Sequence, residues 1–99
     1  MELDKISSEE FKTLLNQQFY IQFTPDVRLG AELIELTELS GYSPLERKPF
    51  SIVFRTEQKT EYYNQGTFIL VHPDTGEIPL FMTPQGFDGI GMKYEAVFS

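Results

Sequence analysis

Near the start of the chain, apolar residues recur with the spacing of a helix. Three of them fall at positions i, i+3 and i+4, on one helical face: Phe11, Leu14 and Leu15. Ser7 and Glu10 fit a capping box, in which the hydroxyl and the carboxylate each accept a hydrogen bond from an unpaired backbone amide. We therefore expect a short N-terminal helix over about residues 7–17. It needs a packing partner, because so short a helix is marginal by itself.

From Gln18 onward the apolar period changes from 3.6 to 2, the period of strands whose side chains alternate between two faces. Turn-forming residues separate the runs, which lie at about 18–24, 28–39, 50–54, 67–72, 77–83 and 92–98. In the second run the apolar positions change parity between Leu33 and Leu36, which indicates a β-bulge. One helix followed by short strands and turns predicts a mainly β fold, a small antiparallel barrel or sandwich of about six strands.

The composition fits one domain with a substantial core. The chain has 99 residues, of which 40% are hydrophobic and 14% aromatic, and this length is typical of a single domain over residues 1–99. It has no cysteine and only 1 histidine. This composition excludes disulfides, thiolate metal sites, cysteine nucleophiles and any metal site that needs two histidines. We therefore expect no metal and no cofactor.

The charge of the chain is strongly acidic. Its 15 acidic and 8 basic residues give a net charge of −7 at pH 7. Nucleic acids and anionic membranes are bound largely through Lys and Arg, so we expect neither as a partner. An acidic surface instead steers a partner with a basic face. No apolar run approaches the ~18 residues of a membrane span, and Met1–Asp4 lacks the features of a secretory signal. These observations predict a cytoplasmic protein.

His72 is the one imidazole of the chain and falls at the end of an expected strand. With Asp74 or Glu77 nearby, it is a candidate general base. The alternative is structural: its ring nitrogens tie down the hairpin turn at 73–76, where proline and glycine suit the required backbone angles. The sequence favours the structural interpretation, and we assign no catalytic residue.

Two other patterns resemble functional motifs but fit structural roles better. Glu32, Glu35 and Glu38 are spaced by three, yet on a regular strand Glu35 lies opposite the other two, which indicates a solvated acidic face. The expected loop over 84–91 carries three glycines. A strand follows it where a dinucleotide-binding motif requires a helix, so we interpret it as a tight corner.

Four aromatic residues fall on expected loops: Tyr42, Tyr62, Tyr63 and Phe87. Aromatic side chains are enriched at binding surfaces, because they give a large contact area at a small entropy cost. They also close the open ends of barrels. Both interpretations stay open, and these four residues are our candidate partner-binding site.

Two stretches of the second half carry distinctive motifs. They are NQGTFILVHPDTGEIPLFMTP over residues 64–84 and GMKYEAVF over residues 91–98. With its QG-T-[FY] start, HP-x-x-G turn, L-F pair and closing YEAVF, the chain resembles an uncharacterised family of small bacterial β domains of unknown function. It departs from the family at Pro79, where an ordinary strand residue is expected. Because proline has no amide to donate to a ladder, Pro79 indicates a strand edge.

The resemblance implies no assigned activity. It implies a setting beside phage-tail-like fibre or collar proteins, as an accessory or assembly factor. The shared residues are those of turns and packing: Phe81, Tyr94 and Phe98 are expected to fill the core, and Glu95 to pair with Arg55. We therefore expect a non-catalytic protein-interaction module whose partner is a protein of a fibre- or tail-like machine. The alternatives are a barrel that holds a small apolar ligand, and a hydrolase-type enzyme that uses His72.

Overall fold

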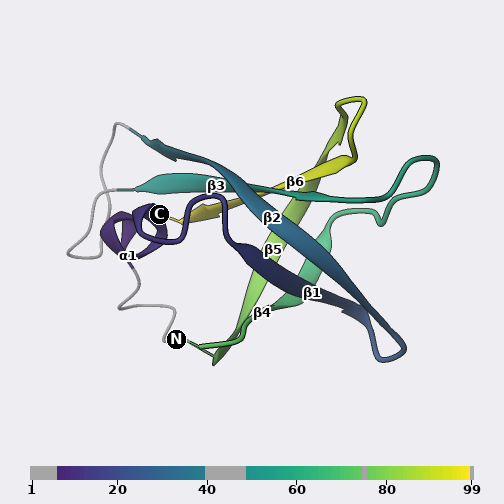
Figure 1. Ribbon diagram of the computed structural model, residues 1–99, viewed down its shortest axis with the longest axis horizontal. Coiled ribbons are helices and arrows are strands. Elements are labelled where there is room, and N and C mark those ends of the chain that lie inside the picture. Colours follow the sequence, from purple (N-terminus) through teal and green to yellow (C-terminus); the bar gives the residue numbers. More distant parts are fainter. Residues whose placement is uncertain (1–6, 40–48, 75, 99) are drawn as a thin grey trace.

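The computed structural model describes residues 7–39, 49–74 and 76–98. They form one helix and six strands: α1 (Ser8–Lys12), β1 (Gln18–Thr24), β2 (Val27–Glu38), β3 (Phe50–Thr56), β4 (Gly66–His72), β5 (Gly76–Phe87) and β6 (Met92–Phe98). All neighbouring strands pair antiparallel and close a barrel in the order β1-β2-β3-β6-β5-β4 (Figure 1). The predicted fold class is confirmed, and of its two forms the barrel is the one adopted.

The helix is shorter than the predicted span of residues 7–17. Its start is as expected, since the Ser7 hydroxyl accepts a hydrogen bond of 3.4 Å from the backbone amide of Glu10. It ends at Lys12, after which the chain continues in turns: the amide of Leu14 donates to the carbonyl of Phe11 at 3.0 Å, and Asn16, with a φ of 67°, donates its amide to the carbonyl of Leu33 in β2 at 2.7 Å. In the described part of the chain, no helix is long and apolar enough to cross a membrane.

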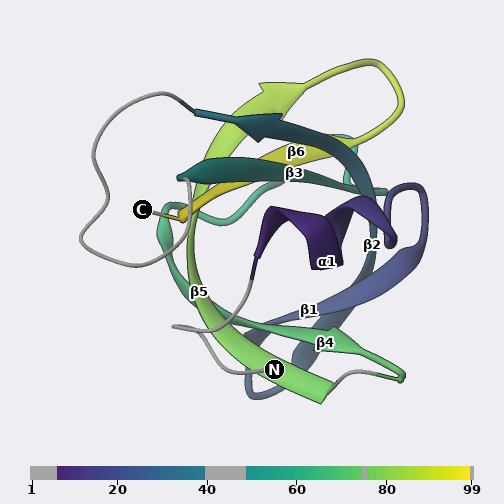
Figure 2. The ribbon, with the colours of Figure 1, turned by 90° about the vertical axis from the view of Figure 1, so that its left-hand side faces the viewer.

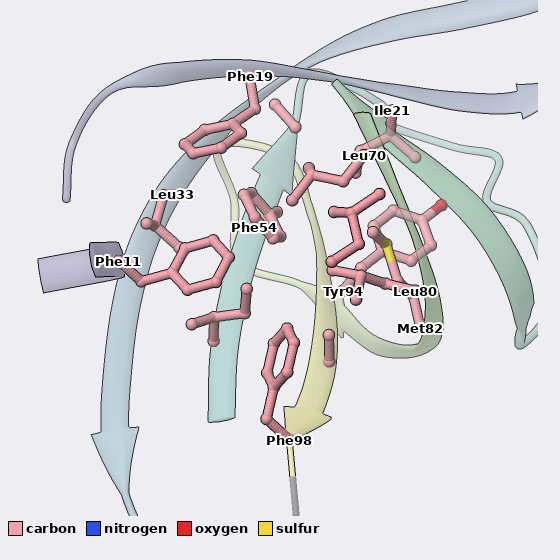
Figure 3. Packing of buried hydrophobic residues seen from close by; sticks show 14 of the residues in the cluster. Phe11, Phe19, Ile21, Leu33, Phe54, Leu70, Leu80, Met82, Tyr94 and Phe98 are labelled. Atoms are coloured by element: carbon pink, nitrogen blue, oxygen red, sulfur yellow. The ribbon is translucent and has the colours of Figure 1, made fainter. Parts of the chain in front are cut away.

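Side chains fill the interior of the barrel (Figure 3). Strand alternation directs one face of every strand inward, and Phe11 of α1 adds to the core. The largest fully buried side chains are Phe11, Phe19, Ile21, Leu33, Phe50, Ile52, Phe54, Leu70, Ile78, Met82 and Tyr94. Seen along the barrel in Figure 2, α1 lies within the ring of strands at one end. It packs Phe11 against the stacked rings of Phe50 and Phe98, with ring centroids at 6.0 and 5.6 Å.

The predicted bulge in β2 is present. The register with β3 shifts between Leu33 and Glu35, so that Leu33 pairs with Phe54 and Leu36 pairs with Ile52. Both leucines therefore face the interior, although their spacing has the wrong parity for a regular strand. The change of parity in the sequence thus reports a real feature of the fold.

Strand β5 is longer than predicted and continues through much of the expected glycine loop. A register shift between Pro84 and Gly86 lets it go on pairing with β6 as far as Phe87, and Gly86 has a φ of 115°. Pro79 pairs with Ile69 of β4, whereas the register with β6 begins only at Thr83. Pro79 therefore lies where β5 has a paired neighbour on one side, as its missing amide indicates.

Two expectations about side chains are wrong. Phe81 does not fill the core: it is 56% exposed, because its neighbours Leu80 and Met82 take the inward positions. Arg55 does not pair with Glu95. Its guanidinium contacts the carboxylates of Glu32 and Asp88, while the register sets Glu95 opposite Val53.

Candidate functional site

The candidate residues gather at the end of the barrel away from α1, which we call the loop end. Three connections form it: the β1–β2 hairpin, the segment 57–65 between β3 and β4, and the β5–β6 hairpin at 88–91 (Figure 1). Tyr62, Tyr63 and Phe87 belong to these connections or border them. Tyr42, the fourth predicted residue, lies outside the described residues.

Tyr63 closes the core at the loop end. Its ring stacks on Phe23 with centroids 4.6 Å apart and an interplanar angle of 11°. Phe23 also contacts Phe68 and Tyr94, at 4.8 and 5.1 Å. These four rings form a continuous apolar layer, so the position of Tyr63 matches the end-closing interpretation of the loop aromatics.

A polar network fixes the segment 57–65 above this layer at two points, Gln58 and Tyr63. The hydroxyl of Tyr94 accepts a hydrogen bond of 3.0 Å from the Tyr63 amide and donates one of 2.7 Å to Oε1 of Gln58. The Thr56 hydroxyl donates to the same oxygen at 2.9 Å. Burial raises the pKa of the Tyr94 phenol, so it stays protonated and keeps its donor.

Tyr62 and Phe87 face outward and lie against each other. Their side chains are 51% and 44% exposed, and their rings meet edge to face with centroids 6.2 Å apart. Ile90, at the tip of the next hairpin, is 59% exposed. The Lys59 ammonium donates a hydrogen bond to the carbonyl of Ile90, which ties the segment 57–65 to this hairpin. We call Tyr62, Phe87 and Ile90 the aromatic surface.

The hairpin that carries Ile90 is held by Asp88. One carboxylate oxygen accepts hydrogen bonds from the backbone amides of Ile90 and Gly91, both at 2.9 Å. The other oxygen accepts from Arg55 of β3 at 3.1 Å. The two amides, together with the Arg55 guanidinium, lower the pKa of Asp88 to about 2. The carboxylate is therefore charged at neutral pH and anchors the hairpin to the barrel wall.

Two adjoining hollows lie beside the aromatic surface. The larger, of about 540 Å³, is lined by residues of β2 and β3, by Gln18 of β1, by Glu57 and Gln58, and by Ile90. The smaller, of about 300 Å³, lies between β2 and the segment 57–65, with Tyr62 and Glu61 in its wall. Leu29 and Gln58 line both hollows. We call the two hollows together the groove, which lies between residues of β2 and the chain that follows β3.

His72 lies near the other end of the barrel and is buried. Its Nδ1 accepts a hydrogen bond of 3.2 Å from the amide of Asp74, within the hairpin turn, as its structural interpretation expects. Its Nε2 is 3.3 Å from Oε1 of Gln17, and its ring lies 4.7 Å from that of Phe19. Neither hollow of the groove is lined by His72.

The bulge of β2 changes the arrangement expected for the three evenly spaced glutamates, because it sets Glu35 on the same face as Glu32, whereas a regular strand would set the two on opposite faces. Glu32 and Glu35 pair with positions 55 and 53 of β3, on the outer face. Glu38 lies at the α1 end, where its carboxylate accepts a hydrogen bond of 2.7 Å from Lys12. Among the residues that the structure describes, no group of three or more His, Asp or Glu side chains is placed to hold a metal ion.

Sequence reasoning missed Ile90 and the groove. Ile90 carries a weak signal, an apolar residue between Gly89 and Gly91, where a turn leaves no room to bury it. No signal in the sequence marks the groove, because the groove forms where β3 stops pairing with β2, and strand pairing is a tertiary property.

The architecture defines a class: small closed antiparallel barrels whose interiors are filled by side chains. Within that class the chain belongs to the family described as a domain of unknown function (DUF6916), whose profile matches residues 6–98. No curated protein and no solved structure matches the chain.

Proposed function

We propose that this domain is a non-catalytic protein-interaction module that docks its partner on the aromatic surface. The observation that carries the proposal is the exposed Tyr62–Phe87 pair. Large apolar side chains that stay exposed together mark binding surfaces more often than singly scattered ones do.

The chain on both sides of the aromatic surface is held by contacts to the barrel. Tyr62 is next to Tyr63, whose ring and amide are fixed on Phe23 and Tyr94. On the other side, Asp88 holds the hairpin that follows Phe87. A preorganised surface binds more tightly, because less conformational freedom is lost on association.

The charge of the chain supports a partner with a basic face. With a net charge of −7, long-range attraction speeds the approach of a basic protein and repels nucleic acids and anionic lipids. The family resemblance adds a phage-tail-like or fibre-type machine as the setting of that partner. The cytoplasmic location expected from the sequence is part of the same proposal.

A capture experiment tests the proposal. The tagged chain is incubated with a lysate of its source organism, and bound proteins are identified by mass spectrometry. Tyr62→Ala combined with Phe87→Ala is expected to abolish capture of a stoichiometric partner. The matched control, Phe81→Ala with Val97→Ala, removes two exposed apolar side chains from β5 and β6 and is expected to retain the partner. Loss in the control but not in the aromatic variant contradicts the proposal.

A small-ligand function is the second candidate, and the larger hollow favours it. Its volume of about 540 Å³ lies within the range of ligand pockets. The hollow is outside the barrel, and Glu32, Arg55 and Glu57 in its wall suit a polar ligand better than an apolar one. A thermal-shift screen with charged and apolar compounds distinguishes the two kinds of ligand.

A further inference from the structure

Part of β2 has a strand neighbour on one side only. β1 pairs with β2 as far as Val27, at the β1–β2 hairpin, whereas the register with β3 starts at Ala31. In an antiparallel pair, every second residue directs its amide and carbonyl away from the partner strand. Between Val27, whose carbonyl accepts a hydrogen bond of 3.3 Å from the Gln22 side chain of β1, and Ala31, every second residue therefore has an amide and a carbonyl on the side where β3 is not paired. An edge of this kind is a template for an added strand.

The groove has the form that an extended peptide needs. Leu29 and Gly30 of β2 line one wall, and Gln58 belongs to the chain across from them. Farther along, Val27 and Tyr62 line the smaller hollow. An added strand directs alternate side chains to opposite faces, so one set meets apolar side chains of the domain while the other faces solvent.

The charges along the groove select the partner. Three carboxylates line it, those of Glu32, Glu57 and Glu61, against the one guanidinium of Arg55. That guanidinium already contacts Glu32 at 3.4 Å and Asp88 at 3.1 Å. In the described ranges, no ion pair involves Glu57 or Glu61. The groove is therefore negative and complements a basic segment, whereas a second copy of this acidic chain is repelled.

We propose that the groove binds an extended basic segment of the partner, which adds as a strand to the edge of β2 at residues 27–30. This inference rests on the proposed function and specifies its partner as a segment in which lysine or arginine alternates with aliphatic residues. The aromatic surface then contacts the partner beside that segment, because Tyr62 and Ile90 each line part of the groove.

The test uses the full chain, labelled with ¹⁵N, and a blocked seven-residue peptide of alternating lysine and valine. Titration is expected to shift the amide signals of residues 27–30 and 56–63 saturably. Two control peptides are expected to shift neither segment: one has glutamate in place of lysine, and the other has N-methyl groups on alternate peptide bonds. Equal binding of the N-methylated peptide overturns strand addition, because its missing amides are the donors of a ladder.

Charge specificity is tested with matched variants. Glu57→Gln with Glu61→Gln is expected to weaken the lysine–valine peptide about threefold, the scale of two exposed charge contacts. Glu35→Gln with Glu77→Gln makes the same change of net charge outside the groove and is expected to leave the affinity unchanged. Equal weakening in both variants overturns the proposal, and so does the absence of shifts in these segments at millimolar peptide. If either of these results is found, loss of partner capture in the Tyr62→Ala, Phe87→Ala variant still supports the proposed function, so the two proposals can fail separately.

Discussion

The two ends of the barrel are closed by different means. At the α1 end, one helical turn packs Phe11 against the stacked rings of Phe50 and Phe98, and the Phe11 ring is fully buried. At the loop end, an irregular segment places Tyr63 on Phe23, while the adjacent Tyr62 stays 51% exposed. Each end thus has one ring that completes the core, and the loop end has a second ring, that of Tyr62, which stays outside the core.

This difference separates the aromatic residues that stabilise the fold from those that are free to contact a partner. A ring that completes the core is held by the free energy of apolar burial, and removing it leaves a cavity. A ring that stays exposed contributes little to folding, and its apolar area becomes useful when a partner covers it. The predictions below test this division, in order of decreasing expected effect.

Phe11→Ala is expected to have the largest effect. Removing a fully buried phenylalanine side chain costs about 4 kcal/mol of unfolding free energy, because both transfer energy and packing are lost. Urea denaturation measures the change. Since this loss is a large part of a typical domain's stability, Phe11→Leu, with an expected cost of about 1 kcal/mol, serves as the folded comparison. A change below about 1 kcal/mol for Phe11→Ala would mean that α1 does not close the barrel.

Gly91→Ala tests how tightly the β5–β6 hairpin packs on β3. An added Cβ would lie 1.7 Å from the carbonyl oxygen of Thr56, so the backbone must move, at an expected cost of about 3 kcal/mol. Gly86→Ala is the matched control. Its φ of 115° disfavours alanine, but no atom lies within 4 Å of the new Cβ, and we expect a loss of about 1 kcal/mol. Equal losses in urea denaturation would contradict the close approach at Gly91.

The adjacent tyrosines give the sharpest test within one segment. Tyr63→Ala is expected to cost about 2 kcal/mol, because its half-buried ring stacks on Phe23. Tyr62→Ala is expected to change the unfolding free energy by less than about 0.5 kcal/mol, as for most exposed positions. Thermal and urea unfolding of the two variants measure the difference. The reverse order would show that Tyr62, not Tyr63, completes the core.

The ends are also expected to differ in their response to pH. The folded pKa of Asp88 is about 2, below its unfolded value of about 3.9, so its stabilisation is present above pH 4 and is lost as the pH falls towards 2. At the α1 end, the hydrogen bonds that Lys12 donates to Glu38 and Glu9 raise the pKa of Lys12, so the stabilisation that its charge gives is lost as the pH rises above 10.

The variant Asp88→Asn isolates the acid response. At pH 7 it is expected to be less stable than the wild type, because it cannot form the ion pair with Arg55. The difference between the two proteins is expected to shrink as the pH is lowered from 5 to 2. A difference that stays constant over this range in urea denaturation shows that the charge of Asp88 does not hold the hairpin.

The strands were predictable from the sequence because burial follows strand alternation. The parity change between Leu33 and Leu36 revealed even the bulge. Two structural details were not predictable. The segment 57–65 has no period, and the inward position of Tyr63 depends on a hydrogen bond to Tyr94, 31 residues away. The helix was overestimated because the residues after Lys12 form turns that lead to a tertiary bond from Asn16 to Leu33, and local apolar spacing does not report such a bond.

The most direct test of the division between the two ends is hydrogen exchange of the domain with and without its captured partner. The account predicts slower exchange in residues 57–65 and 87–91 of the complex, and unchanged exchange in residues 8–17 around α1. Slower exchange around α1 together with unchanged exchange at the loop end would contradict it.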